Sequence, residues 1–163
     1  MVTMPTDLGE IVRTDRGPQL RLAASYPVSA AQVWAALTEP DRVGRWLGRL
    51  TLSGTAGRVD FDDGYADLTV LACDAPHRME LGWAFDGGVV TSLAVTLSGD
   101  TRVDLEHTFP VDREPAGVAV YGCGWQYYLD ALGAQLAGAP LPAWGDYYPG
   151  RLDEWRARVP SAG

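Results

Sequence analysis

The segment that decides the fold is "SAAQVWAALTEPDRVGRWLG", residues 29–48. It contains two helix starts in quick succession. Ser29 with Gln32 three residues later makes a capping box, the reciprocal arrangement that satisfies the first backbone N–H groups of a helix. Thr38 with Asp41 three residues later makes a second capping box, and Pro40 lies inside it. Proline is favourable in the first turn of a helix but not in its interior. The segment therefore predicts two short helices joined at a proline turn.

Both helices have an apolar side to bury, because their hydrophobic residues recur at helical spacing. These residues are Val33, Trp34 and Leu37 in the first helix, and Val43, Trp46 and Leu47 in the second, which is expected to end near Gly48. Upstream, residues 1–18 are polar and weakly patterned and are expected to form an N-terminal arm. Residues 19–28, "QLRLAASYPV", alternate and predict the first strand.

Downstream of the two helices, from residue 49 to 109, the hydrophobic period changes to two. Turn-forming sequences interrupt this region at 54–57, 62–64, 73–77, 86–88 and 98–100. Short alternating runs separated by turns predict an antiparallel meander. Within "RMELGWAF" and "TSLAVTL" the apolar residues share one face, so the sheet has a face that must be covered.

The cover is a long helix, expected from about Val118 to Ala137. Apolar and aromatic residues form one stripe at three- and four-residue spacing, namely Tyr121, Trp125, Tyr128, Leu129, Leu132 and Leu136. Twenty helical residues span ~30 Å, which is enough to cross a sheet. Gly138 is typical of a helix end. The strands and long helix make one domain over residues 19–140, and residues 141–163 are expected to be a tail packed on it.

The composition of the chain excludes several classes of function. The chain has 163 residues and a formal net charge of -8, and all 13 of its basic residues are arginines. The lack of lysine excludes Schiff-base chemistry and lysine-dependent phosphate loops, and an acidic chain without a basic stripe is a poor partner for nucleic acid or an anionic membrane. Cys73 and Cys123 make no disulfide framework and favour a reducing compartment, so we expect a cytoplasmic protein. No signal peptide, membrane-spanning helix, metal-ligand spacing or cofactor motif is expected.

Three stretches resemble one known family. "YPVSAAQVWAALTEPDRVGRWLG", "TRVDLEHTFP" and "GWQYYLDALGAQLAG" are similar to the first helices, last strand and final helix of bacterial homologues of the activator of the ninety-kilodalton heat-shock protein ATPase. The resemblance covers roughly residues 20 to 148. That family lies in the superfamily of START domains, polyketide cyclases and birch-pollen-allergen-like proteins. It implies an α+β helix-grip fold, in which a curved antiparallel sheet of about seven strands wraps around the long C-terminal helix.

The resemblance also implies a cavity between sheet and helix, where superfamily members bind apolar molecules. The leading hypothesis is therefore a non-enzymatic protein that holds a small apolar or aromatic ligand. The alternative is a cyclase- or hydrolase-type enzyme with His107 as general base. A chaperone-activator-like interaction module is a weaker alternative. Monomer and homodimer both remain open, since the tail aromatics at 144, 147, 148 and 155 could support a dimer or pack on their own domain.

His107 is the residue that the pattern does not explain. It lies in "RVDLEHTFP", where alternation places it on the same inward face as Leu105 and Phe109. It is either a polar anchor for an apolar ligand or a neutral core histidine bonded to a tyrosine hydroxyl or a backbone carbonyl. Glu106 points to the opposite face and cannot orient the imidazole, so a catalytic dyad lacks its acid.

The candidate ligand-binding residues share an inward face of the sheet or the buried stripe of the long helix. They are Trp83, Leu93, Leu105, His107, Phe109, Tyr121, Trp125 and Tyr128. Arg42, Arg45 and Arg49 are expected on a solvated face, with the alternative that one of them meets a ligand carboxylate at the pocket mouth. The glycines at 117, 122 and 124 are hypothesised to loosen the start of the long helix, where a ligand would enter.

Overall fold

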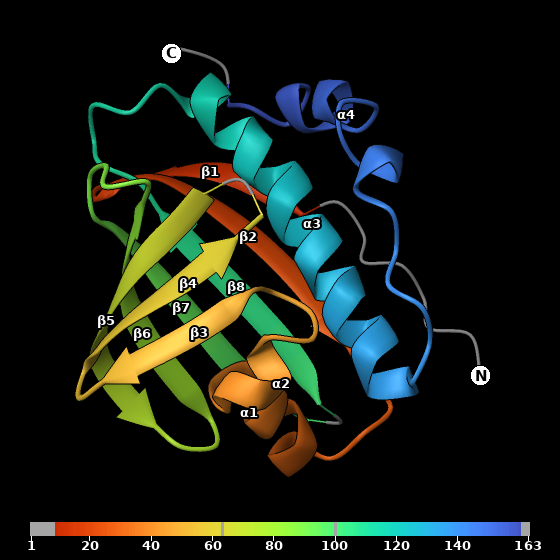
Figure 1. Cartoon of the computed structure of the whole chain (residues 1–163). Coiled ribbons are helices and arrows are strands. Elements are labelled where there is room, and N and C mark those ends of the chain that lie inside the picture. The colour runs from red at the N-terminus through yellow and green to blue at the C-terminus, as the bar shows by residue number, and fades with distance from the viewer. Residues whose placement is uncertain (1–8, 63, 100, 161–163) are drawn as a thin grey trace.

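The computed structural model describes residues 9–62, 64–99 and 101–160. It is an α+β protein with one antiparallel sheet in the order β1-β2-β8-β7-β6-β5-β4-β3, as Figure 1 shows. The strands are β1 (Glu10–Thr14), β2 (Gly17–Ser25), β3 (Arg49–Ser53), β4 (Ala56–Phe61), β5 (Gly64–Asp74), β6 (Arg78–Phe85), β7 (Thr91–Ser98) and β8 (Arg102–Thr108). The meander β3–β8 confirms the prediction from the turn spacing, and β2 closes onto β8.

The sheet has eight strands rather than about seven, because part of the expected arm is a strand. Of the segment 1–18, residues 1–8 lie outside the described residues, while β1 pairs with β2 in a hairpin. Ile11 of β1 is buried in the core. Gly17 begins β2 with φ 127°, and a Cβ there would lie 1.9 Å from the carbonyl oxygen of Phe109. The tight approach to the end of β8 therefore requires glycine.

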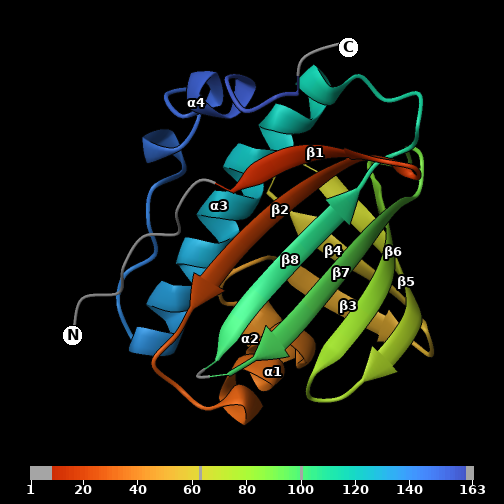
Figure 2. The same ribbon diagram turned by 180° about the vertical axis from the view of Figure 1, so that it is seen from behind.

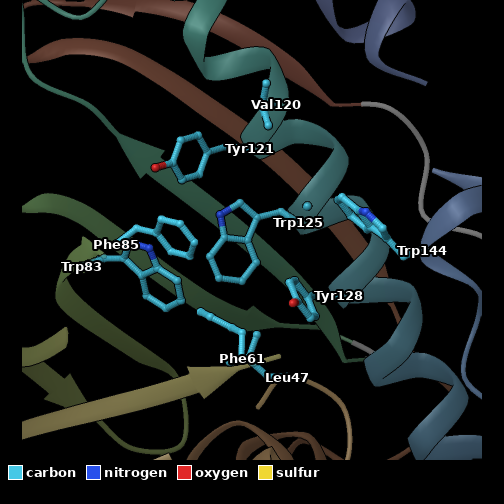
Figure 3. A pocket seen from close by; sticks show the side chains of 10 residues that line it. Leu47, Phe61, Trp83, Phe85, Val120, Tyr121, Trp125, Tyr128 and Trp144 are labelled. Atoms are coloured by element: carbon cyan, nitrogen blue, oxygen red, sulfur yellow. The ribbon is translucent and has the colours of Figure 1, made fainter. Parts of the chain in front are cut away.

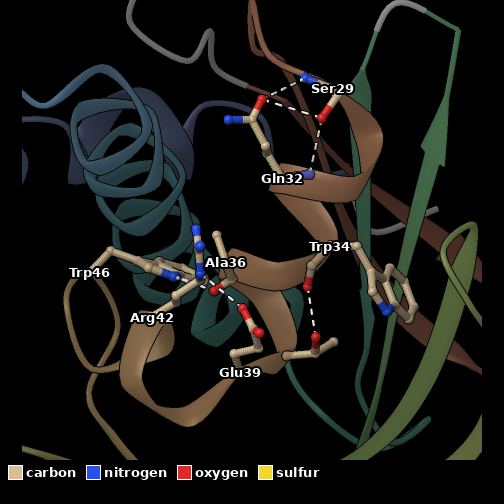
Figure 4. Close-up of polar contacts among 8 residues, drawn as sticks. Ser29, Gln32, Trp34, Ala36, Glu39, Arg42 and Trp46 are labelled. Atoms are coloured by element: carbon tan, nitrogen blue, oxygen red, sulfur yellow. Dashed lines mark hydrogen bonds and ion pairs between the residues drawn. The ribbon is translucent and has the colours of Figure 1, made fainter.

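The helices after β2 confirm the first capping box and correct the second (Figure 4). Helix α1 (Ala30–Thr38) begins at Ser29, whose Oγ accepts a hydrogen bond from the backbone N–H of Gln32 at 3.2 Å, while the Gln32 side chain accepts from the Ser29 N–H. Thr38 does not cap α2 (Pro40–Val43): its hydroxyl donates to the carbonyl oxygen of Trp34 at 2.7 Å. Thr38 is still helical, so its hydroxyl reaches back one turn instead of forward.

Helix α2 is shorter than expected, because the regular helix stops at Val43 rather than near Gly48. Trp46 nevertheless is buried, and its indole N–H donates to the carbonyl oxygen of Ala36 at 2.8 Å (Figure 4). This bond ties the turn after α2 back to α1. Leu47 is partly buried against the core.

The long helix α3 (Pro115–Ala137) begins three residues before the expected start and ends at Gly138, which is left-handed with φ 68°. Among the strands, its close backbone contacts are to β2 and β1, and Figures 1 and 2 show it running along that side of the sheet. The hydroxyl of Tyr26 donates to the carbonyl oxygen of Leu129 at 2.7 Å and fixes the helix there. The strands β4–β6 consequently lie farther from α3, and side chains must fill the space between them.

The C-terminal segment folds back over the outer side of α3 through η1 (Trp144–Asp146) and α4 (Leu152–Arg156). Trp155 is fully buried and donates its indole N–H to Gln126 Oε1 at 3.1 Å. The hydroxyl of Tyr147 donates to Asp130 Oδ2 at 2.6 Å, and burial together with this bond raises the pKa of Tyr147. Within the described ranges, no helix has the length and apolar character needed to cross a membrane.

Candidate functional site

A cavity of about 270 Å³ lies between α3 and the half of the sheet whose backbone is farther from α3 (Figure 3). Aromatic side chains from both elements meet there and leave space that they do not fill. The cavity is lined by Leu47, Phe61, Trp83, Phe85, Val120, Tyr121, Gly124, Trp125, Tyr128 and Trp144. None of these ten described residues carries a charge, so the pocket suits a neutral ligand.

The inner wall of the pocket is built from two tryptophans that face each other across the gap. The ring centroids of Trp83 on β6 and Trp125 on α3 are 5.2 Å apart. Tyr128 lies one turn along α3 from Trp125 and contacts Phe61 of β4, with ring centroids 5.9 Å apart. Both tryptophans are at least nine-tenths buried. The inner wall is therefore aromatic and buried.

The outer rim of the pocket comes from three separate parts of the chain. Phe85 at the end of β6, Val120 on α3 and Trp144 in η1 are 38%, 45% and 44% exposed, respectively. Exposed apolar side chains that surround a cavity mark its opening. Trp144 stacks on Tyr148 with centroids 5.6 Å apart, so the tail contributes an aromatic edge to the opening.

His107 lies behind the pocket wall and does not line the cavity. Its Nδ1 accepts a hydrogen bond from the indole N–H of Trp125 at 3.0 Å, and its Nε2 lies 2.6 Å from the hydroxyl oxygen of Thr91. An indole nitrogen can only donate, so Nδ1 must be the acceptor and the proton resides on Nε2. The Thr91 hydroxyl then donates to the carbonyl oxygen of Trp83 at 2.8 Å. The chain of bonds joins the two tryptophans of the pocket wall through the sheet.

This bonding favours the core interpretation of His107, although its partners differ from the tyrosine or carbonyl that we expected. The side chain is fully buried, and burial lowers its pKa to about 3, with the nearby Arg113 adding to the shift. A neutral imidazole with both nitrogens engaged has no free lone pair for a substrate proton. His107 is thus a positioning residue for Trp125.

The sequence-predicted residues divide into two layers. Trp83, Tyr121, Trp125 and Tyr128 line the cavity. The other four lie in the core beneath it, fully or nearly fully buried: Leu93, Leu105, His107 and Phe109. Phe109 stacks on the imidazole of His107, with ring centroids 4.3 Å apart. Alternation in the strands and helical spacing in α3 placed these residues on inward faces, but these patterns could not separate wall from core.

The lining residues that the sequence did not name as ligand-binding include Phe61, Phe85 and Gly124, although Gly124 was placed near the expected entrance. Phe61 and Phe85 flank the turns at 62–64 and 86–88, and lie at inward positions of their strands. A Cβ built on Gly124 would meet no atom within 4 Å, so this glycine leaves space in the wall. At Gly122 a Cβ would lie 2.3 Å from the Trp155 ring, so this glycine admits that ring.

The arginines after α1 do not reach the cavity. Arg42 forms an ion pair with Glu39 at 2.8 Å on the surface, and Arg45 and Arg49 are exposed. None of the three lines the pocket. The expectation of a solvated face therefore describes the position of these three arginines.

The indole N–H of Trp83 is the unusual polar group of the site. It is buried and has no hydrogen-bond partner among the residues that the structure describes. The buried indoles of Trp46, Trp125 and Trp155 all donate to protein acceptors. An unpaired buried donor costs about 1–3 kcal/mol, and each such group calls for an explanation.

Comparison with known proteins agrees with this architecture. The model of the family "Activator of Hsp90 ATPase homolog 1-like protein" matches residues 27–137, more than half of the chain. The chain belongs to this family. The match extends from the start of α1 to the end of α3, and so includes every element that builds the pocket except the tail. No curated protein matches the sequence.

Solved structures place this family member beside proteins of the same superfamily. The crystal structure of CalU16 from Micromonospora echinospora is 26% identical, with a TM-score of 0.77 over 97% of this chain and 100% of that one. DynU16, a protein in the dynemicin biosynthetic locus, is 29% identical, with a TM-score of 0.71 over 80% of this chain. The present chain spans about half (51%) of the length of DynU16. The Aha1 dimer from Colwellia psychrerythraea shares the fold. It is 17% identical to this chain, with a TM-score of 0.60 over 72% of this chain and 95% of that one.

Proposed function

We propose that this protein binds a neutral, apolar or aromatic small molecule in the pocket between α3 and the sheet. The observation that carries the proposal is the aromatic cavity of about 270 Å³, open at Phe85, Val120 and Trp144 and lined without a charged residue among those described. A concave, mostly apolar site with a few polar groups is the usual form of a small-molecule pocket.

The relatives support a ligand of secondary-metabolite type. DynU16 comes from the dynemicin biosynthetic locus, and both it and CalU16 are more than 25% identical to this chain. We include a cytoplasmic location in the proposal, because Cys73 and Cys123 are both unpaired. A reaction with His107 as general base has no geometric support, since both of its ring nitrogens are engaged in the core.

Binding is tested by filling the cavity from its own wall. In Gly124→Phe a ring enters the space that the glycine leaves, and Gly117→Phe is the matched control on the exposed side of α3, outside the pocket. Neutral aromatic compounds are titrated while the tryptophan fluorescence of the protein, to which Trp83 and Trp125 contribute, is followed. We expect saturable quenching in the wild type and in Gly117→Phe, and none in Gly124→Phe. Equal responses in all three proteins would contradict the proposal.

Native mass spectrometry followed by solvent extraction identifies the natural ligand. An adduct that is present in the wild type and absent from Gly124→Phe would name the ligand class. An adduct retained by Gly124→Phe would place the bound molecule elsewhere on the protein.

A further inference from the structure

From the unpaired indole of Trp83 we infer that the ligand of this pocket carries a neutral oxygen acceptor, such as a ketone or quinone carbonyl, that accepts a hydrogen bond from Trp83 Nε1–H. This inference rests on the proposed function and adds to it the chemical class of the ligand. It begins from a donor that the protein buries in the pocket wall without an acceptor of its own.

The two tryptophans of the wall differ in just this respect. The Trp125 N–H is bound by His107, so that indole offers the ligand its ring faces alone. The backbone carbonyl of Trp83 is occupied by the Thr91 hydroxyl, whereas its indole N–H is unoccupied. A ligand oxygen is the partner that removes the cost of an unmade hydrogen bond at this position.

The position of the indole nitrogen fits a ligand that enters from the rim. In Figure 3 the nitrogen lies on the edge of the Trp83 ring nearest Phe85 and Tyr121, and the benzene edge lies towards Phe61. Phe85 is a rim residue, 38% exposed, and its ring contacts that of Phe61, with ring centroids 6.0 Å apart. An aromatic ligand that displaces this ring from the cavity brings its oxygen to the indole N–H.

The charge of the acceptor follows from the rest of the wall. No lining residue among those described is cationic, and the chain has a net charge of -8. A carboxylate or phosphate would lose its hydration without gaining a counter-charge, which costs far more than one hydrogen bond returns. A neutral carbonyl loses less and gains the indole donor.

Matched pairs of neutral probes test the inference: fluorene with 9-fluorenone, and anthracene with anthraquinone. In each pair the ring system is retained and the oxygen is added. One indole hydrogen bond predicts that the carbonyl member binds about tenfold more tightly to the wild type. Trp83→Phe removes the donor and is expected to reduce this preference to about onefold, while Tyr121→Phe, which removes a neighbouring hydroxyl from the same wall, retains it.

A spectroscopic measurement makes the test independent of how Trp83→Phe folds. The six tryptophans give one indole N–H resonance each in a ¹H–¹⁵N spectrum. The carbonyl probes are expected to move the Trp83 resonance downfield, in the sense of a new hydrogen bond, and the hydrocarbons are not. If both members of a pair bind equally and the Trp83 resonance does not distinguish them, the inference is wrong and the binding function stands. If no probe binds, the proposed function itself fails.

Discussion

Alanine substitution at two glycines of α3, only two residues apart, is expected to change stability in opposite directions. At Gly124 an added Cβ meets no atom within 4 Å. At Gly122 the same Cβ would lie 2.3, 2.6 and 2.7 Å from three ring carbons of Trp155. Both residues lie inside the same helix, so the change in helix propensity is the same at the two sites.

The magnitudes follow from these contacts. Replacing glycine by alanine in a helix stabilises by about 0.5–1 kcal/mol, and Gly124→Ala is expected to gain this in full. At Gly122 the gain is offset by overpacking of about 1–3 kcal/mol, because Trp155 is fully buried and donates to Gln126, so its ring cannot shift without losing that bond. The net effect of Gly122→Ala is a loss of up to about 2.5 kcal/mol, and of about 1 kcal/mol at the middle of the two ranges.

The assay is urea denaturation of the wild type and the two variants, followed by circular dichroism, with thermal unfolding alongside. A chain of this length shifts in Tm by about 2–4 °C for each kcal/mol. We expect the Tm of Gly124→Ala to rise and that of Gly122→Ala to fall. If Gly122→Ala proved as stable as Gly124→Ala, the packing of α4 on α3 through Trp155 would be refuted. Trp155→Ala in the Gly122→Ala background separates the causes, since it removes the clash.

Three further predictions concern His107 and α1. The pKa of His107 is lowered to about 3, whereas an unfolded histidine titrates near pH ~6.5, so between these two pH values the unfolded state binds one more proton than the native state. The free energy of unfolding should therefore fall by about 1.4 kcal/mol for each pH unit by which the pH is lowered through this range. Urea midpoints measured from pH ~7.5 to ~5 check this, and His107→Gln should flatten the slope. His107→Asn keeps an acceptor near the place of Nδ1, so the indole N–H of Trp125 should stay hydrogen-bonded and its resonance should stay in place. His107→Gln keeps an amide near the place of Nε2 instead, so the Trp125 resonance should shift upfield. Identical spectra of the two variants would contradict the positioning role. Ser29→Ala should lower the free energy of unfolding by about 1 kcal/mol through loss of the capping box, while Thr38→Ala, whose hydroxyl caps no helix, should have a smaller effect in the same denaturation assay.

Features that depend on neighbours in the sequence were predictable. The capping box at Ser29, the meander with its turns and the end of α3 at Gly138 all follow from residues within a few positions of one another. Alternation also placed His107 and Trp83 on the inward face correctly, because side chains of a strand alternate whatever lies opposite.

Features that depend on distant segments were not predictable in the same way. The strand β1 has a weak pattern of its own and forms because β2 offers it a hydrogen-bonding edge. The requirement for glycine at position 122 comes from Trp155, which lies more than thirty residues later in the chain and reaches α3 only when the tail folds back.

The sequence by itself determined the family, the order of the elements from β2 to α3 and most of the inward-facing aromatic residues. Tertiary structure decided which of these residues form a pocket and which form a core. Helix α3 packs against β1 and β2, and the space that this leaves above β4 and β6 is shared among rings from both sides. His107 is engaged on both nitrogens, and Trp83 is left with a free donor, because of where residues of β7 and α3 come to lie beside them. Hydrogen bonds between residues so far apart in the chain depend on three-dimensional register, which no local pattern encodes.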